Sequence, residues 1–355
     1  MKRWWIGLCL WGCSEGEQAL PVVPSTPDPS IPFGADGYDD PPGAGRFFVL
    51  NQLGFADPGR GFDLDGRCGE RSCADNVLAP LGPELNDELR QALLGGENLV
   101  LLELAGLEAP YQGDNRDVSL KLYAARDADE PFFPANNFKV PLGQTSCCRF
   151  KVTASSMTGA EPQARSRTRG RIDRARFSAT ENFTLDLASV TSSQADHRIG
   201  LLFTAPLRRA LVSGRIPVGL REFNEGLLGG AWAARDLAVI PGLRLCAPSD
   251  DSCPDASSGW TALDVVRTAF GLQPDIDLDE DGPECLYDRD GDGTLDLCCD
   301  QEPGPCGEAQ CAGVSIPPLV AGDPSSCVLD PRMADGYSVG FTFTAVGAEM
   351  VGVAR

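Results

Sequence analysis

The stretch GYSVGFTFTAV, residues 336–346, is the clearest indicator of the fold in this chain. Large apolar side chains alternate in it with small or polar ones. A period of two places the two sets on opposite faces of a β-strand, so one face is predicted to be buried. The two sets are Tyr337, Val339, Phe341 and Phe343 on one face and Ser338, Gly340, Thr342 and Thr344 on the other. We predict that residues 331–355 form a C-terminal strand that returns to the main sheet.

Upstream of this strand the chain contains many short segments that read as strands separated by turn residues. Residues 46–245 are therefore predicted to form a mainly β domain, either a sandwich or a barrel-like sheet. The predicted strands are 46–55, 98–107, 117–125, 138–142, 149–155, 171–179, 183–190, 198–206 and 210–220.

Only a few short helices are predicted. Residues 83–96 begin with a proline, carry a stripe of leucines and end in two glycines, which is typical of a helix. Residues 260–271 show a similar stripe and end at Gly271. Residues 223–242 are ambiguous, because the pair Gly229-Gly230 would weaken a helix at its middle.

The composition of the chain excludes several classes of function. Its 51 acidic and 30 basic residues give a formal net charge of -21, which repels phosphate backbones and argues against nucleic-acid binding. His197 is the one histidine, which leaves little material for Ser-His or Cys-His catalysis. No apolar run approaches the roughly 18 residues that a membrane-spanning helix needs, so no transmembrane span is predicted.

The N-terminus has the pattern of a secretory leader, because two basic residues precede an apolar run that ends in LWGC, residues 10–13. This ending resembles the lipobox of bacterial lipoproteins. The resemblance implies that residues 1–12 are removed and that Cys13 carries a lipid anchor, which would hold the protein at the outer membrane, on its periplasmic face or at the cell surface. Residues 13–45 are rich in Pro, Gly, Ser and Asp and are predicted to be a flexible tether. The alternative is an ordinary cleaved leader and a secreted soluble protein.

Cysteine usage indicates an oxidising compartment. Twelve of the 14 cysteines lie beyond Cys13, and an even number in an exported chain is typical of disulfides. The adjacent cysteines Cys147 and Cys148 are each expected to reach a different partner, as are Cys298 and Cys299. Zinc is disfavoured because the chain has no CxxC motif.

Residues 250–300 are strongly acidic and contain a repeat. DLDEDG at 277–282 is followed eleven residues later by DRDGDG at 288–293. Alternate aspartates place several carboxylates on one side of a tight loop, and the glycine lets the backbone close around a hard cation. Calcium (Ca2+) fits best because it accepts six to eight oxygen ligands. The predicted metal ligands are Asp277, Asp279, Asp281, Asp288, Asp290, Asp292 and Asp296.

The tandem spacing, the shared Asp288 and the nearby cysteines resemble thrombospondin type 3-like calcium repeats, over about residues 275–300. The resemblance implies neighbouring loops that share ions and are braced by disulfides. We predict that residues 246–330 form a Cys-rich acidic calcium-binding module. The alternative for the repeat is a solvated acidic linker.

A shorter acidic pattern occurs near the start of the β domain. Asp63 and Asp65 precede a glycine, and Asp75 follows Cys73. A third calcium site and an acidic turn closed by a disulfide explain this pattern equally well.

Four arginines alternate along the segment ARSRTRGRIDRAR, at Arg165, Arg167, Arg169 and Arg171. On a strand they would line one face and could bind anions, such as lipopolysaccharide phosphates, acidic glycans or a partner's carboxylates. The alternatives are a solvated edge strand and pairing with acids of the same chain.

These features favour a calcium-binding, lipid-anchored cell-envelope protein with a structural, adhesive or ligand-binding role, whose partner would be an envelope protein or a glycan. An enzyme is the less favoured class. One alternative is an envelope hydrolase that cleaves glycans with a pair of carboxylates. Another is a surface protein that binds polyanions through the arginine strip, which we define as Arg165, Arg167, Arg169 and Arg171.

Overall fold

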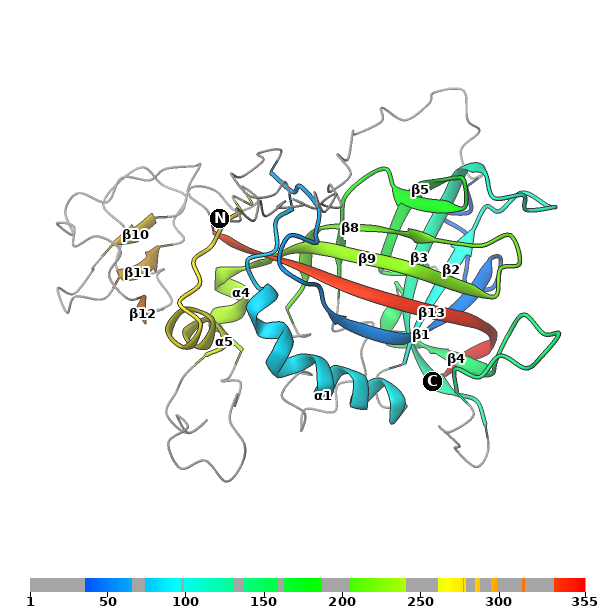
Figure 1. Cartoon of the computed structure of the whole chain (residues 1–355), viewed down its shortest axis with the longest axis horizontal. Coiled ribbons are helices and arrows are strands. Elements are labelled where there is room, and N and C mark those ends of the chain that lie inside the picture. The colour runs from blue at the N-terminus through cyan, green and yellow to red at the C-terminus, as the bar shows by residue number, and fades with distance from the viewer. Residues whose placement is uncertain are drawn as a thin grey trace, which may run out of the picture.

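The fold was analysed in a computed structural model (Figure 1). It describes residues 36–65, 74–96, 99–129, 137–158, 163–186, 205–240, 261–276 and 335–354. It also describes residue 278 and the backbone of 285–287, 295–298 and 315–316. The prediction of a mainly β protein with a barrel-like sheet and few short helices is confirmed.

Eight antiparallel strands form a closed barrel. Each strand pairs with the next one of the set along the chain, and the last pairs with the first, so no strand of the ring is left at an open edge. The strands are β1 (Arg46–Phe55), β2 (Leu99–Ala105), β3 (Asn115–Asp127), β5 (Ser166–Asp173), β6 (Arg176–Ala179), β8 (Leu207–Arg215), β9 (Glu222–Ala233) and β13 (Gly336–Ala354).

Five short strands lie outside this ring, two beside it and three in a sheet of their own. β4 (Arg149–Thr153) joins the ends of β3 and β13, antiparallel to the first and parallel to the second. β7 (Phe183–Leu185) pairs with β8. A separate sheet contains β10 (Cys285–Tyr287), β11 (Leu295–Cys298) and β12 (Ser315–Ile316).

Strand β13 closes the barrel between β9 and β1, as its alternating sequence predicts. Tyr337, Val339, Phe341 and Phe343 all belong to the main hydrophobic core. The opposite face of β13 is not fully exposed to solvent. Ser338 on this face is completely buried, and its hydroxyl group is hydrogen-bonded to Val77 and to Asp275.

Aromatic rings fill the barrel. The Phe223 ring contacts the rings of Phe48, Phe177 and Phe343, with centroid separations of 6.2, 6.3 and 5.3 Å. Gly214 makes room for this packing, since a Cβ atom there would lie 2.1 Å from the Phe223 ring. The interior is therefore a packed core, which is usual for a barrel of eight strands.

The helices cover the barrel. The predicted helix near residue 83 is confirmed as α1 (Gly82–Leu94), which follows the 3-10 turn Ala79–Leu81 and buries its leucine stripe. The ambiguous segment 223–242 continues as β9 through its glycine pair and then turns into α4 (Ala234–Ala238).

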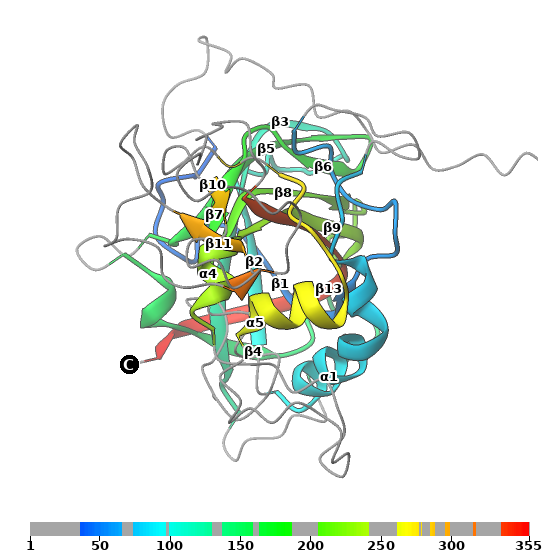
Figure 2. The ribbon, with the colours of Figure 1, turned by 90° about the vertical axis from the view of Figure 1, so that its left-hand side faces the viewer.

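The predicted helix at 260–271 is α5 (Ala262–Asp264), continued by a π turn, Val265–Ala269. Leu237 of α4 and Leu263 and Val266 of this second helix join the barrel core. Figure 2 looks onto the end of the barrel where α4 and α5 lie, with both helices in front of the strands. Among the described helices, none combines the length and the apolar character that crossing a bilayer requires.

Some predicted strands are wrong. Residues 138–142 contain no strand, and residues 138 and 142 lie in turns. The predicted strand 171–179 is a hairpin, in which β5 and β6 are joined by Arg174 and Ala175, both with positive φ. For the predicted strand 198–206, residues 205 and 206 are not in a strand, and 198–204 lie outside the described residues.

Candidate metal site

Three aspartates meet on the wall of the barrel. One carboxylate oxygen from each of Asp63, Asp65 and Asp75 lies within 4.8 Å of the others. All three residues are half-buried, and one oxygen of Asp63 is buried without a hydrogen-bond partner. Carboxylate oxygens at this spacing are the ligands that a hard divalent cation prefers, so the cluster could hold a metal ion. We call these three residues the aspartate triad.

Backbone pairing brings the triad together. Phe62 and Asp75 form an antiparallel bridge, in which the Asp75 amide donates to the Phe62 carbonyl at 2.9 Å. The Leu64 amide in turn donates to the Asp75 carboxylate at 2.6 Å. These two bonds hold residues 62–65 beside residues 74–76, and we call these two described segments the triad turn.

Asn76 fastens this turn to the barrel. Its side-chain amide donates to the carbonyls of Ala56 and Arg60, and its oxygen accepts from the Gly340 amide on β13 at 2.9 Å. The Asn76 side chain is buried, so these bonds take the place of the hydrogen bonds that it makes with water in the unfolded chain. The triad is therefore carried by a turn that is fixed to β13.

A fourth carboxylate approaches from the acidic segment. Asp275 as a residue is exposed, but its carboxylate is turned against β13, where it accepts from the Ser338 amide at 2.8 Å and from the Ser338 hydroxyl. The Ser338 hydroxyl oxygen also accepts from the Val77 amide at 2.8 Å. Ser338 thus links the triad turn to the start of the acidic repeat.

The environment opposes the charged forms of two carboxylates at this site, those of Asp75 and Asp275. Burial, together with the charges of Asp65, Asp275 and Asp63, raises the pKa of Asp75 to about 6, although the hydrogen bond from the Leu64 amide lowers it. Burial also raises the pKa of Asp275, against the hydrogen bonds from Ser338. A bound cation would relieve this repulsion.

Most of the predicted metal ligands cannot be located. Asp277, Asp279, Asp281, Asp288, Asp290 and Asp292 lie outside the described residues. Asp296 lies on β11, where only the backbone is described. The lipidation residue Cys13 and His197 are likewise outside the described residues. The acidic pattern for which the structure gives side-chain geometry is therefore the one at Asp63, Asp65 and Asp75.

The chain leading into the acidic repeat is anchored to the barrel. Ile276 bridges Gly336 at the start of β13, and the Leu278 amide donates to the Asp335 carboxylate at 2.7 Å. Arg209 on β8 donates to the Leu278 carbonyl at 2.9 Å. The repeat therefore begins next to the aspartate triad.

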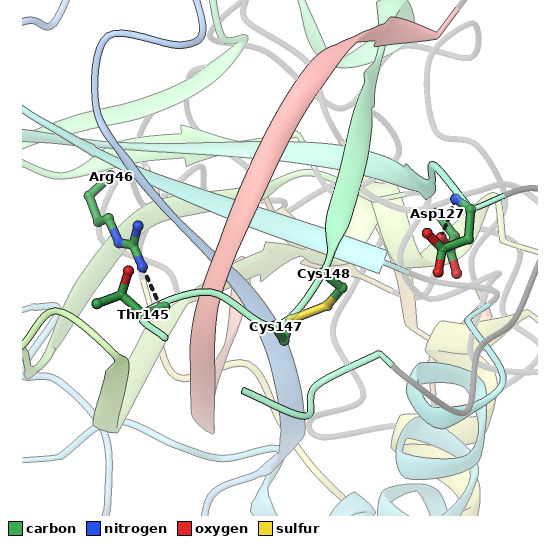
Figure 3. Close-up of a disulfide and its surroundings, with 6 residues drawn as sticks. Arg46, Asp127, Thr145, Cys147 and Cys148 are labelled. Atoms are coloured by element: carbon green, nitrogen blue, oxygen red, sulfur yellow. Dashed lines mark hydrogen bonds between the residues drawn. A yellow bond between two sulfur atoms is a disulfide. The ribbon is translucent and has the colours of Figure 1, made fainter. Parts of the chain in front are cut away.

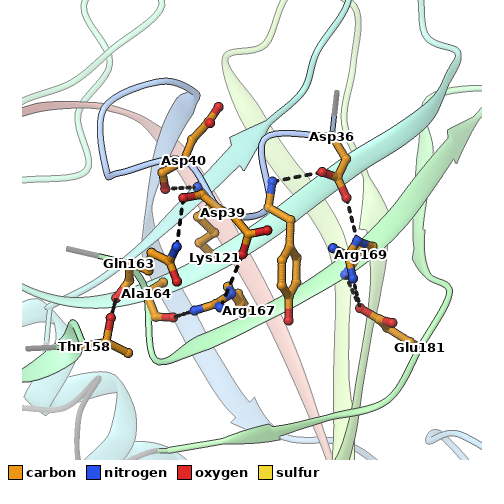
Figure 4. A network of polar contacts seen from close by, with 11 residues as sticks. Asp36, Asp39, Asp40, Lys121, Thr158, Gln163, Ala164, Arg167, Arg169 and Glu181 are labelled. Atoms are coloured by element: carbon orange, nitrogen blue, oxygen red, sulfur yellow. Dashed lines mark hydrogen bonds and ion pairs between the residues drawn. The ribbon is translucent and has the colours of Figure 1, made fainter. Parts of the chain in front are cut away.

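Three residues of the arginine strip, Arg167, Arg169 and Arg171, lie on β5, and Arg165 directly precedes it. Arg167 and Arg169 face the first described segment, residues 36–45 (Figure 4). Arg169 pairs with Asp36 at 2.7 Å and with Glu181 at 3.6 Å. Arg167 pairs with Asp39 at 3.6 Å.

The aromatic ring of Tyr38 lies beneath both guanidinium groups, 3.9 Å from that of Arg169 and 4.7 Å from that of Arg167. Arg165 donates to the Met157 carbonyl, and Arg171 is exposed. Two of the four arginines are thus paired with acids of the same chain.

Residues 36–45 pack onto the barrel, whereas the sequence predicts a flexible tether up to residue 45. The buried carboxylate of Glu103 accepts from the amides of Gly43 and Gly45, at 3.0 and 2.8 Å, and from the Tyr123 hydroxyl at 2.8 Å. The buried ammonium of Lys121 donates to the Asp40 carbonyl at 2.7 Å. Sequence analysis missed this network, since Glu103 and Lys121 occupy strand positions that read as ordinary polar residues.

The prediction that Cys147 and Cys148 reach different partners is wrong, because the two adjacent cysteines are bonded to each other (Figure 3). The backbone on both sides is held against β13, which keeps the two side chains together. The Cys147 amide donates to the Gly347 carbonyl, and the Glu349 amide donates to the Cys148 carbonyl.

Comparison with known proteins identifies no relative: no protein family, curated protein or solved structure matches the chain.

Proposed function

We propose that this chain is a calcium-binding, lipid-anchored protein of the cell envelope, with a structural, adhesive or ligand-binding role. The proposal is supported chiefly by the aspartate triad, which lies beside Asp275, at the entrance to the acidic repeat. Four carboxylates in this position repel one another, and a divalent cation would turn that repulsion into attraction.

Calcium would act as a structural ion in this proposal. The triad turn is attached to β13 through Asn76, and the acidic repeat is attached to the same strand through Ile276 and Leu278. An ion shared by these two elements would make the repeat and the barrel one rigid unit. Calcium suits such a site better than magnesium, because it tolerates irregular coordination by six to eight oxygens.

A partner would then be bound at the surface of the molecule. The barrel is filled by aromatic side chains, which favours a role for its outer surface and for the acidic repeat. The lipid anchor rests on the leader sequence and Cys13, and it would place this surface at the outer membrane next to envelope proteins and glycans. A glycan hydrolase is the second choice, since the triad is more easily explained as a cation site.

The polyanion alternative is also placed second. An anionic ligand would have to displace Asp36 and Asp39 to reach Arg169 and Arg167. Arg165 and Arg171 are the exposed residues of the strip, and Arg165 already donates to the Met157 carbonyl.

Calorimetric titration of calcium into chelator-stripped, oxidised residues 14–355, with melting curves in parallel, tests the proposal. We expect saturable binding at two or more sites and a higher melting temperature. At calcium concentrations 100 times the dissociation constant, one site adds about 2.7 kcal/mol to the free energy of unfolding.

Variants separate the two parts of the proposal. The double substitution Asp63→Asn and Asp75→Asn should abolish one site, and Asp288→Asn with Asp290→Asn should abolish binding to the repeat. Asp87→Asn, which removes an exposed carboxylate from α1, is the matched control. Absence of saturable binding by the unmutated protein would reject calcium and leave the acidic repeat as a linker.

A further inference from the structure

The disulfide between Cys147 and Cys148 lies in the wall of an open pocket of about 560 Å³. Both cysteines are half-buried and pack against a small hydrophobic cluster that includes Phe47, Tyr123 and Phe150. The residues that precede them, 143–145, are exposed. Because both cysteines line the pocket, a small molecule bound in it would lie next to the disulfide.

This disulfide contributes little to holding the fold together. It joins neighbours in the sequence, and the chain-entropy effect of a disulfide grows with the length of the loop that it closes. The surrounding backbone is fastened by two hydrogen bonds to β13, at 2.7 and 2.9 Å, that do not involve sulfur. The bond can thus be opened and closed while the barrel stays folded.

The pocket carries charges that suit a particular class of thiol. The charged residues among those that line it are Asp129, Glu349 and Arg149. Arg149 and Glu349 are paired in register on β4 and β13, so they lie side by side. The lining has a net negative charge, which favours a thiol that carries an ammonium group.

We propose that Cys147 and Cys148 form a thiol–disulfide exchange site for small aminothiols. A thiolate of the aminothiol attacks one protein sulfur, the S–S bond breaks, and a mixed disulfide and a protein thiolate result. A second aminothiol thiolate attacks the mixed disulfide, releasing the oxidised aminothiol and the second protein thiolate. Two thiolates are oxidised, one protein disulfide is reduced, and the two protein thiolates take up two protons.

The sequence around the pair provides a direct assay. Trypsin cleavage after Lys139 and Arg149 releases VPLGQTSCCR, residues 140–149, which contains both cysteines and no other. The full-length oxidised protein is treated with cysteamine, quenched with acid, alkylated and digested without reductant. Mass spectrometry then distinguishes the closed peptide from one with two alkyl groups.

We expect the peptide to be closed at the start and to become doubly alkylated while circular dichroism still reports a folded barrel. A peptide cross-linked to another cysteine-containing peptide would overturn the assignment. So would a pair that stays closed until the protein unfolds.

Selectivity is tested by comparing reduction rates of Glu349→Gln and the unmutated protein. For cysteamine, the rate should fall about fivefold in the variant, as expected for one charge contact near a surface. For uncharged 2-mercaptoethanol it should not change. Asp87→Asn, which removes an acid from α1, controls for net charge and should change neither rate. Equal effects of Glu349→Gln on both thiols would overturn the preference for aminothiols. The Glu349→Gln variant should bind calcium like the unmutated protein, whichever result is found for the thiols.

Discussion

At the scale of single residues, the candidate site depends on side chains whose charge is unfavourable where they lie. Asp75 is the clearest case, because burial and three neighbouring carboxylates raise its pKa to about 6. Asn76, next to it in the sequence, supplies the hydrogen bonds that hold this arrangement against β13. Asp75 thus supplies the charge at this site, and Asn76 attaches the turn to β13.

Asp75→Asn should stabilise the protein in the presence of a chelator. The folded-state pKa of Asp75 lies above its ordinary value of 3.8, so its effect on stability is absent at low pH and becomes unfavourable as the pH rises from about 4 to 6. The gain at pH 7 should be about 1 kcal/mol, after allowance for solvent screening of a half-buried group.

Urea unfolding of both proteins at pH 4 and pH 7 measures this difference. The asparagine oxygen can still accept from the Leu64 amide, so the turn is retained. A variant that is equally stable or less stable at pH 7 would contradict the assigned electrostatics.

Gly214→Ala tests the packing inside the barrel. The added methyl group would meet the Phe223 ring at 2.1 Å, so the ring must move within a crowded aromatic cluster. We expect a loss of about 2 kcal/mol in the free energy of unfolding, typical of overpacking. Gly219→Ala is the matched control, because its nearest atom would be 3.8 Å away. Similar melting temperatures for the two variants would show that the interior is less tightly packed.

At the scale of elements, the first described segment behaves as part of the barrel. Residues 36–45 are held by Glu103 and Lys121 on β2 and β3 and by Arg167 and Arg169 on β5. These contacts shorten the tether that could connect the barrel to a membrane anchor.

Arg169→Gln should loosen this segment. The variant loses the ion pair with Asp36 and the cationic contact with Tyr38, which together are worth about 1 kcal/mol at a partly exposed position. Chymotrypsin cleavage after Tyr38 should become about fivefold faster under conditions in which local opening precedes cleavage. Arg171→Gln, on the same strand but exposed, should leave the cleavage rate unchanged.

At the scale of the whole molecule, the net charge of -21 makes stability sensitive to salt. Self-repulsion of a strongly acidic chain is screened as ionic strength rises, so the chelated protein should melt at a higher temperature in 0.5 M than in about 0.02 M sodium chloride. Calcium at millimolar concentration should raise the melting temperature more than sodium chloride of equal ionic strength. Equal shifts would indicate screening alone and would count against a specific ion.

Local patterns in the sequence were enough to predict the class of the fold and its C-terminal strand. Alternation along 336–346 identifies a strand because side-chain direction has a period of two, and this is a local property of the chain. The same holds for α1, whose leucine stripe and terminal glycine are local signals. The closure of the ring between β1 and β13 was decided only in three dimensions, since it joins segments nearly the whole chain apart.

The candidate site divides in the same way. The acidic pattern at Asp63, Asp65 and Asp75 could be read from the sequence, but the approach of Asp275 could not, because it depends on the hydrogen bonds of Ser338. The bond between Cys147 and Cys148 and the pairing of Arg169 with Asp36 were also decided by tertiary structure. Residue type and spacing indicate which secondary structure and which ligands a segment can form. Which side chains contact one another depends on which segments the fold brings side by side.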